Sequence, residues 1–262
     1  MILETIAKET VERVRIEKER ISYVDMRRMA ESMQKKVFLF EDVLQGEGSH
    51  FICEVKKASP SKGVIATEFP YTTIAKEYEE AGAACISVLT EPNHFLGSDS
   101  YLSEIANIVH IPILRKDFTI DAYQIYQAKA IGADCVLLIV ALLSKEKLKE
   151  YLHLCDSIGL SAIVEVHDEL EVWVALHAGA RIIGINNRNL KNFNMDPFNS
   201  IRLKKHIPDT VICIAESGIS CRDDIRRYED AGIYNFLIGE TLMKSRNKQE
   251  KLKELKGIVD KN

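Results

Sequence analysis

Eight short apolar segments recur from residue 51 onward, and they limit the folds that this sequence can adopt. They follow one another at intervals close to the ~30 residues of a strand, helix and strand unit. Short runs of this kind with few polar interruptions are typical of strands buried on both faces. The runs cover residues 51–55, 85–89, 111–114, 135–140, 162–166, 182–185, 211–215 and 236–238.

Helix-like segments separate these runs, so the chain alternates between the two kinds of element. Several of them end in a glycine between small residues, as at Gly82, Gly132, Gly179 and Gly232, and this is a common C-terminal stop of a helix. Buried strands that alternate with helices predict a parallel sheet covered by helices. The helical segments include residues 72–81, 121–131, 144–158, 168–178 and 222–231.

Eight such units predict an α/β protein, a single (β/α)8 TIM barrel with an N-terminal helical extension. The alternative is an open, doubly wound sheet, but no G-x-G-x-x-G pattern follows the first apolar run. No linker rich in proline, glycine or serine divides the chain, so we expect one domain over residues 1–262. Residues 1–48 form the extension, and residues 49–262 form the eight βα units.

The extension precedes every predicted strand and has the pattern of a charged helix. Leu3, Ile6, Val11 and Val14 stand at roughly helical spacing among many charged residues. Two interpretations remain open from the sequence. The helix either plugs one end of the barrel or contributes to the active site.

Composition excludes several classes of function. The chain has 35 basic and 39 acidic residues and a net charge of -4, so it has no broad basic surface for nucleic acid or an anionic membrane. Its first residues lack the apolar core of a signal peptide, and no apolar run reaches the ~18 residues of a membrane span. We therefore expect a cytoplasmic protein that binds neither nucleic acid nor membrane, with no obligate protein partner evident.

Six cysteines occur without a C-x-x-C pair, and three of them interrupt apolar runs. Cys53, Cys135 and Cys213 are expected to be small buried hydrophobic residues in a reducing compartment. No serine stands in a G-x-S-x-G elbow, and no histidine has the spacing of a metal site. His167 and His177 are expected to border a helix. We expect no metal and no cofactor.

Charged and polar side chains stand at the C-terminal ends of five of the apolar runs. An unpaired ion in a buried strand costs several kcal/mol or loses its charge through a pKa shift, so each such position needs a reason. For one residue, a salt bridge at the barrel rim is a sufficient reason. Five strands together predict an acid and base site at the end where barrel enzymes place their active sites. The residues are Glu54 with Lys56, Lys116 between Arg115 and Asp117, Glu165 with His167, Asn186 with Arg188, and Glu216 with Ser217.

Glycine-bearing turns follow the last two apolar runs. Gly218 stands in residues 216–219 and Gly239 in residues 238–241, where TIM barrels commonly bind phosphate through backbone N–H groups. Lys56 and the loop that begins at Ser59 are expected nearby. Ordinary turn glycines are the alternative, but two turns in consecutive units favour a phosphorylated small-molecule substrate.

At these residues the chain resembles the indole-3-glycerol-phosphate synthases. The resemblance implies closure of 1-(2-carboxyphenylamino)-1-deoxyribulose 5-phosphate to indole-3-glycerol phosphate, with loss of carbon dioxide and water, in tryptophan biosynthesis. The activity is that of a carboxy-lyase that works by general acid and base catalysis. The six matching blocks lie in order, each on its own predicted strand, and cover residues 54–63, 114–118, 164–169, 185–190, 215–219 and 237–240.

The resemblance also implies roles for individual residues. Lys116 would be the general acid on the substrate carbonyl, and Glu165 the acid and base partner in dehydration. Lys56 would contact the substrate carboxylate or phosphate, and its closeness is expected to lower the pKa of Lys116. The remaining implied residues are Glu54, Asn186, Arg188, Glu216 and Ser217 for orientation, Ser59, Gly218, Gly239 and Glu240 around the phosphate, and Phe95 and Phe118 against the anthranilate ring.

Two departures and two rival functions bear on this interpretation. Some family members have serine where this chain has Glu240, so only the backbone N–H of Glu240 is credited with binding phosphate. Some relatives continue into a second barrel, for which this chain is expected to have no room. The rivals are another phosphate-binding barrel, such as a sugar-phosphate isomerase or a tryptophan synthase α-subunit, and a barrel that serves as a scaffold without catalysis.

Overall fold

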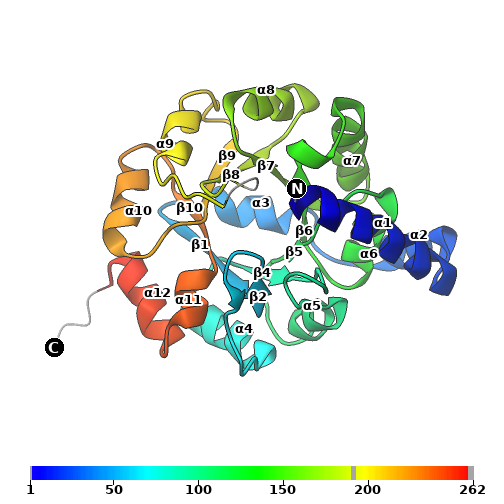
Figure 1. Cartoon of the computed structure of the whole chain (residues 1–262), viewed down its shortest axis with the longest axis horizontal. Helices are drawn as coiled ribbons and strands as arrows, with labels where there is room; N and C mark the ends of the chain where they lie inside the picture. The colour runs from blue at the N-terminus through cyan, green and yellow to red at the C-terminus, as the bar shows by residue number, and fades with distance from the viewer. Residues whose placement is uncertain (1, 190–192, 259–262) are drawn as a thin grey trace.

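The eight predicted strands form one closed parallel barrel in the computed structural model, which describes residues 2–189 and 193–258. Their order around the barrel is β1-β10-β9-β8-β7-β6-β5-β4, so the predicted TIM barrel is confirmed and the open sheet is excluded. Helices surround the barrel on all sides (Figure 1). The strands are β1 (His50–Val55), β4 (Cys85–Leu89), β5 (Ile113–Lys116), β6 (Cys135–Ile139), β7 (Ser161–Val166), β8 (Ile182–Asn186), β9 (Ile212–Glu216) and β10 (Asn235–Ile238).

Four strands end elsewhere than the apolar runs predict, and two of them, β8 and β9, run one residue further, to Asn186 and Glu216. The third was expected at residues 111–114, but β5 continues through Arg115 and Lys116. Both charges are compensated there, because Arg115 meets Asp99 and Lys116 meets Glu165. At the end of β6, Val140 begins a short 3-10 helix, η1 (Val140–Leu142).

The five predicted helices are present within about two residues of their expected ends. The four stop glycines have positive φ angles between 79° and 100°, as a helix C-terminus of this kind requires. The helices α5, α9, α11 and α12 and a two-stranded hairpin of β2 (Ala58–Ser59) and β3 (Gly63–Val64) were not assigned from sequence. The helices of the barrel are α4 (Tyr71–Glu80), α5 (Asp99–Ala106), α6 (Ala122–Ala130), α7 (Lys145–Ser157), α8 (Glu169–Ala178), α9 (Asn199–Lys204), α10 (Arg222–Glu229), α11 (Glu240–Lys244) and α12 (Lys248–Lys256).

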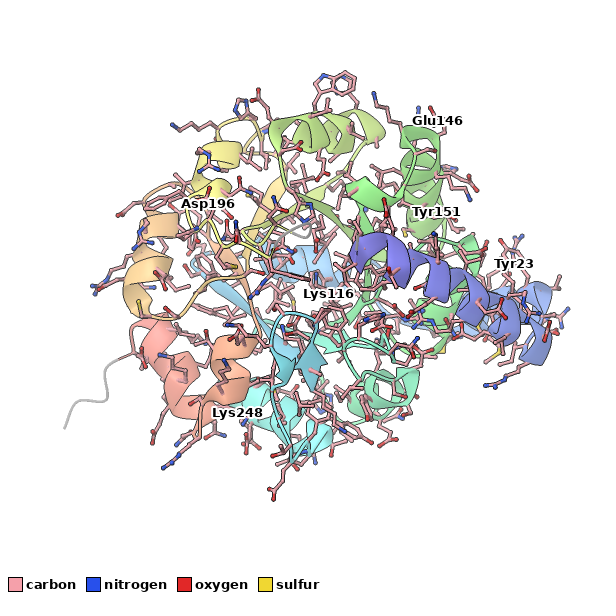
Figure 2. The ribbon with its side chains drawn as sticks, in the orientation of Figure 1. Tyr23, Lys116, Glu146, Tyr151, Asp196 and Lys248 are labelled. Carbon is pink, nitrogen blue, oxygen red and sulfur yellow. The ribbon has the colours of Figure 1, made fainter. Side chains whose placement is uncertain are left out.

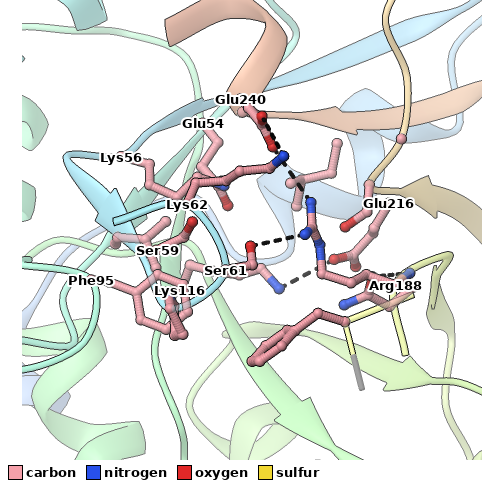
Figure 3. A pocket seen from close by; sticks show the side chains of 18 of the residues that line it. Glu54, Lys56, Ser59, Ser61, Lys62, Phe95, Lys116, Arg188, Glu216 and Glu240 are labelled. Atoms are coloured by element: carbon pink, nitrogen blue, oxygen red, sulfur yellow. Dashed lines mark hydrogen bonds and ion pairs between the residues drawn. The ribbon is translucent and has the colours of Figure 1, made fainter. Parts of the chain in front are cut away.

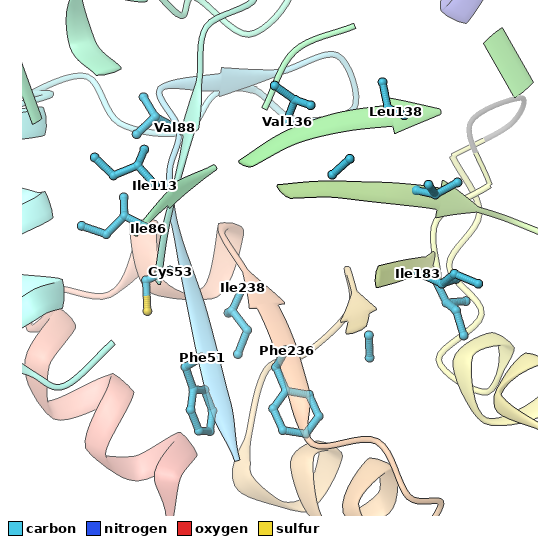
Figure 4. Close-up of a cluster of buried hydrophobic side chains, with 14 of the residues drawn as sticks. Phe51, Cys53, Ile86, Val88, Ile113, Val136, Leu138, Ile183, Phe236 and Ile238 are labelled. Atoms are coloured by element: carbon cyan, nitrogen blue, oxygen red, sulfur yellow. The ribbon is translucent and has the colours of Figure 1, made fainter. Parts of the chain in front are cut away.

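Alternation along the strands divides the core into two compartments. One residue points outward to the helices and the next points into the barrel. Figure 4 shows part of the outward cluster, which includes Phe51, Cys53 and Phe236. The inward cluster fills the barrel with Ile52, Leu114 and other aliphatic residues. Cys53, Cys135 and Cys213 are buried free thiols, as predicted.

The extension forms three helices, and they serve both ends of the barrel. They are α1 (Ile2–Arg20), α2 (Tyr23–Ser32) and α3 (Leu39–Leu44). Phe40 and Leu44 of α3 pack against the inward cluster and close the N-terminal end of the barrel. Helix α1 lies across the opposite end (Figure 1), where Ile6 lines a cavity. Helix α3 therefore plugs one end of the barrel, as one interpretation predicted, while α1 borders the cavity and its contribution to the active site stays a prediction.

The buried face of α1 differs in one residue from the predicted pattern. Ile6 and Val14 are buried, but Val11 is 59% exposed and takes no part in packing. Ion pairs hold the helix to the barrel, from Arg13 to Asp117 at 2.8 Å and from Lys18 to Asp121 at 2.7 Å. Met1 and Leu190, which belong to the predicted extension and to one block of the resemblance, lie outside the described residues.

No helix among the described residues is both long and apolar enough to cross a membrane.

Replacement of Phe40 by alanine should show how far the barrel depends on α3. Phe40 is fully buried, so we expect Phe40→Ala to lower the free energy of unfolding by about 3–5 kcal/mol. Urea unfolding followed by circular dichroism measures the change. The matched control is Val24→Ala, at a residue 62% exposed, which should change it by no more than ~0.5 kcal/mol. Equal effects of the two variants would mean that α3 does not seal the barrel.

Candidate active site

A cavity of about 470 Å³ opens at the C-terminal ends of the barrel strands. Its volume lies in the range of small-molecule sites, ~300–1,000 Å³. All fourteen site residues expected from the sequence line it, and Figure 3 labels several of them, which come from different strands and loops. The fourteen are Glu54, Lys56, Ser59, Phe95, Lys116, Phe118, Glu165, Asn186, Arg188, Glu216, Ser217, Gly218, Gly239 and Glu240.

The charged residues on the cavity floor stand one step above the apolar filling of the barrel. Glu54, Lys116 and Glu165 each follow an inward core residue by two positions, so they point inward as well. Lys116 accordingly lies near the centre of the barrel in Figure 2. A period of two thus brings side chains from separate strands together at one level.

Lys116 holds two buried carboxylates. Its Nζ donates to Oε2 of Glu165 at 2.8 Å and to Oε2 of Glu216 at 3.2 Å. The side chains of Glu165 and Glu216 are each 2% exposed, and that of Lys116 is 13% exposed. Oε1 of Glu216 is buried and has no hydrogen-bond partner among the described residues. One ammonium group therefore balances two carboxylates in a region with little water.

Burial and charge act against each other on these three groups. Burial opposes the ammonium form of Lys116, but the attraction of Glu165 and Glu216 is greater and raises its pKa well above the usual range. Burial also opposes ionisation of Glu165, yet Lys116 and His167 keep its pKa far below normal. For Glu216, burial and the repulsion of Glu165 outweigh the attraction of Lys116 and raise the pKa to about 7.

The expected lowering of the Lys116 pKa by Lys56 is wrong in this arrangement. Lys56 forms an ion pair with Glu54 on its own strand, so its charge is already matched. Lys116 lies closer to carboxylates than to any cation that acts on its pKa. The sequence shows which charges reach the cavity, but it does not show how they pair.

Two glycines make room for the buried carboxylates. A Cβ atom on Gly184 of β8 would overlap Oε1 of Glu216, and one on Gly239 would overlap Oε1 of Glu54. The sequence analysis assigned no role to Gly184, although a glycine inside a strand often marks a close approach by another group.

Asn187 was also given no role from the sequence. Its Nδ2 donates to the carbonyl of Ser217 at 3.1 Å.

The proposed phosphate turns lie on the side of the cavity that carries the cations. Ser217 and Gly218 have φ angles of 69° and 80°, so the turn after β9 is left-handed at both residues. Arg188 donates to Oγ of Ser61 at 2.8 Å and lies 3.5 Å from the carboxylate of Glu240. Figure 3 shows these contacts, which link the β2-β3 hairpin to the start of α11.

The opposite side of the cavity is apolar and aromatic. The rings of Phe95 and Phe118 have centroids 6.0 Å apart and are tilted by 42°. The backbone of each is fixed by an acidic side chain, since the N–H of Phe95 donates to Glu91 and that of Phe118 to Asp117. The cavity thus has an aromatic wall, a charged floor and a cationic rim.

Two histidines flank or end helix α8, and one group of possible metal ligands lies outside the cavity. His167 directly precedes α8 and His177 lies in its last turn, so both border a helix as predicted. Glu9, Glu91 and His94 bring ligand atoms within 4.8 Å of one another outside the cavity. Their oxygens already accept hydrogen bonds, as from the N–H of His94 to Glu91. That no metal is needed stays a prediction.

Comparison with solved structures shows the fold. The chain is similar to 3-hexulose-6-phosphate synthase from Salmonella typhimurium, with 12% identity and a TM-score of 0.65 over 80% of this chain and 97% of the other. It is also similar to KGPDC from Streptococcus mutans, with 13% identity and a TM-score of 0.62 over 81% and 97% of the two chains. At such identity the likeness concerns the barrel and not its chemistry.

Comparison of sequences shows the family. The model of the Indole-3-glycerol phosphate synthase family matches residues 3–255. Indole-3-glycerol phosphate synthase of Lachnoclostridium phytofermentans is 50% identical over 99% of this chain and 100% of its own length. The enzyme of that name from Ruminiclostridium cellulolyticum is 52% identical over 98% of this chain and 99% of its own. The resemblance first noted at the strand ends thus extends over nearly the whole length of the chain. The chain belongs to the indole-3-glycerol phosphate synthase family.

Proposed function

We propose that this chain closes 1-(2-carboxyphenylamino)-1-deoxyribulose 5-phosphate to indole-3-glycerol phosphate, with loss of carbon dioxide and water. The observation that carries the proposal is the floor of the cavity, where Lys116 is held between Glu165 and Glu216. The reaction needs protons moved at defined atoms and needs no electron sink, so acid and base groups in a dry pocket are suited to it.

Substrate binding would divide between the two sides of the cavity. The phosphate would meet the backbone N–H groups at Gly218 and Gly239 and the cations Lys56 and Arg188, and Ser59 also lines the cavity. The anthranilate ring would lie against Phe95 and Phe118. This orientation brings the ketone of the substrate over the charged floor.

Ring closure would use Lys116 as the acid. The aromatic carbon that bears the carboxylate attacks the ketone carbon, and Lys116 gives a proton to the ketone oxygen. The pairing with carboxylates keeps Lys116 protonated at neutral pH. A substrate that draws the ammonium away from Glu165 and Glu216 removes that stabilisation and makes Lys116 a stronger acid.

The later steps would involve Glu165. Loss of carbon dioxide restores the aromatic ring, and the hydroxyl then leaves as water when it receives a second proton, for which Lys56 is the donor at hand. Glu165 would take the proton from the carbon next to nitrogen, which completes the indole. Glu54, Asn186, Glu216 and Ser217 would orient these groups. Two protons go on and one comes off, so each turnover takes one proton from the medium.

Lys116→Arg separates the charge of this residue from its proton. An arginine keeps a cation between the two carboxylates but does not give up its proton at neutral pH. We expect kcat to fall at least ~100-fold in a continuous assay of indole fluorescence, because a positioned acid contributes ~10²-fold to 10⁴-fold. The melting temperature should drop less than that of Lys116→Met, which deprives two buried carboxylates of the ammonium that they share. A Lys116→Arg enzyme with near wild-type kcat would show that charge alone is needed.

Arg188→Gln should report on phosphate binding. Loss of a charged hydrogen bond costs about 1.5–3 kcal/mol, so KM should rise roughly 10-fold to 100-fold with a smaller change in kcat. Inorganic phosphate should inhibit the wild type competitively and this variant more weakly. Arg202→Gln, at an arginine whose side chain is 56% exposed, is the control and should keep wild-type constants. If both variants bind phosphate as the wild type does, the anion site lies elsewhere.

Chelation should leave turnover intact. The acid and base steps above use side chains alone, so incubation with EDTA followed by the fluorescence assay should return the untreated rate. A loss of activity that a divalent ion restores would mean that a metal takes part in the reaction.

A further inference from the structure

Glu165 is short of positive charge once Lys116 engages the substrate. Oε2 of Glu165 accepts a hydrogen bond from the ammonium group of Lys116, and the same group also donates to Glu216. Oε1 of Glu165 accepts from the amide of Asn186 at 3.3 Å, which orients the carboxylate but carries no charge. A buried carboxylate that loses its counter-ion takes up a proton and ceases to be a base.

A second cation lies beside this carboxylate and is not among the residues that line the cavity. Nε2 of His167 is 3.4 Å from Oε1 of Glu165. It is fully buried and has no hydrogen-bond partner of good geometry among the described residues. Nδ1 of the same ring lies 3.0 Å from Oε2 of Glu171 on α8. His167 does not line the cavity, so substrate has no direct access to it.

The position of this ring is fixed from three sides. The backbone N–H of His167 donates to Glu171 at 2.7 Å, and its carbonyl accepts from Nδ2 of Asn199 on α9 at 3.1 Å. Glu171 therefore bonds both the ring and the backbone of one residue. Because α8 begins right after β7, the side chain of Glu171 reaches back over the end of the strand that carries Glu165.

We propose that His167 is a positioning residue, a fixed imidazolium held by Glu171 that keeps Glu165 ionised while Lys116 is engaged with the substrate. The inference rests on the proposed roles of Lys116 and Glu165. In this proposal the ring supplies a positive charge and makes no contact with the substrate. This role also explains why a neutral amide from Asn186 is not sufficient at the same carboxylate oxygen.

The charges around the ring support a lasting imidazolium. Burial opposes its charged form, but the electrostatic attraction of Glu165 and Glu171 and the contact of Nδ1 with Glu171 outweigh it and raise the pKa of His167 to about 10. The titratable groups that face it among the described residues are Glu165 from β7 and Glu171 from α8, with Lys116 of β5 beyond Glu165. The cation is thus present across the neutral range.

Replacement of His167 by glutamine tests the charge. Glutamine offers an N–H donor to Glu165 but no charge, so the pKa of Glu165 should rise in the variant. The acid limb of the pH profile of kcat, which reports on the enzyme with substrate bound, should then move upward by about one pH unit, since one unit corresponds to a tenfold change in the ionisation equilibrium. Activity should recover toward the wild type above that limb, and KM should stay within about twofold, because His167 does not touch the cavity.

Glu171→Gln should change the other side of the profile. Without its acidic partner the imidazolium loses its proton at lower pH, so kcat should fall at alkaline pH and remain close to the wild type at acid pH. His177→Gln, on the exposed side of α8, is the control and should leave the profile unchanged. Thermal unfolding of each variant verifies that it is folded at the assay temperature.

The outcomes distinguish a failure of the proposed function from a failure of the role proposed for His167. If the wild type forms no indole product, the proposed function fails. If the wild type is active but His167→Gln keeps the wild-type profile, or loses activity equally at every pH, His167 has no charge role and the inference is overturned. Shifts of the two limbs in opposite senses in the two variants support it.

Discussion

The ammonium of Lys116 between two buried carboxylates is the interaction on which the site depends. A barrel interior is apolar, and a lone charge there would cost several kcal/mol. The cluster is tolerated because the three groups are within hydrogen-bond distance and because Glu216, with a pKa of about 7, need not be fully ionised. The same compensation keeps a proton on Lys116 and a charge on Glu165, the states in which an acid and a base are ready to work.

The residues on either side of Lys116 anchor it to the helical layer. Arg115 and Asp117 point to the opposite face, where Arg115 donates to Asp99 at 2.8 Å and to the carbonyl of Gln124 at 3.0 Å. Asp117 accepts from Arg13 of α1 at 2.8 Å. Residues 115–117, at the end of β5, thus contact the cavity floor, two barrel helices and the N-terminal extension. An ion pair joins α1 to the residue next to Lys116.

Sequence alone predicts the strands and the charges at their ends because both follow from periodicity, whereas Ser59, Phe95 and Phe118 were assigned to the site through the family resemblance. A period of two places Glu54 on the same face as Ile52, and glycines such as Gly179 mark the ends of helices. Partnership between distant residues leaves no such trace. The pairing of Lys116 with Glu216 spans 100 residues, and the need for glycine at position 184 appears only when Glu216 is seen beside it. From the sequence, His167 is only a residue that borders a helix. Its proximity to Glu165 appears in the structure alone.

The fold and the chemistry are carried by different parts of the chain. Barrels only 12–13% identical to this one superimpose over about four-fifths of its length, so the alternation of apolar strands and helices can be kept while most side chains change. What such barrels share is a rim where charges are less costly than in the interior, since each strand end is partly open to the cavity. A function is then set by which charges occupy that rim and how they are paired. In this chain the pairing keeps one lysine protonated and one glutamate ionised within 2.8 Å of each other, in a cavity that the rings of Phe95 and Phe118 also line.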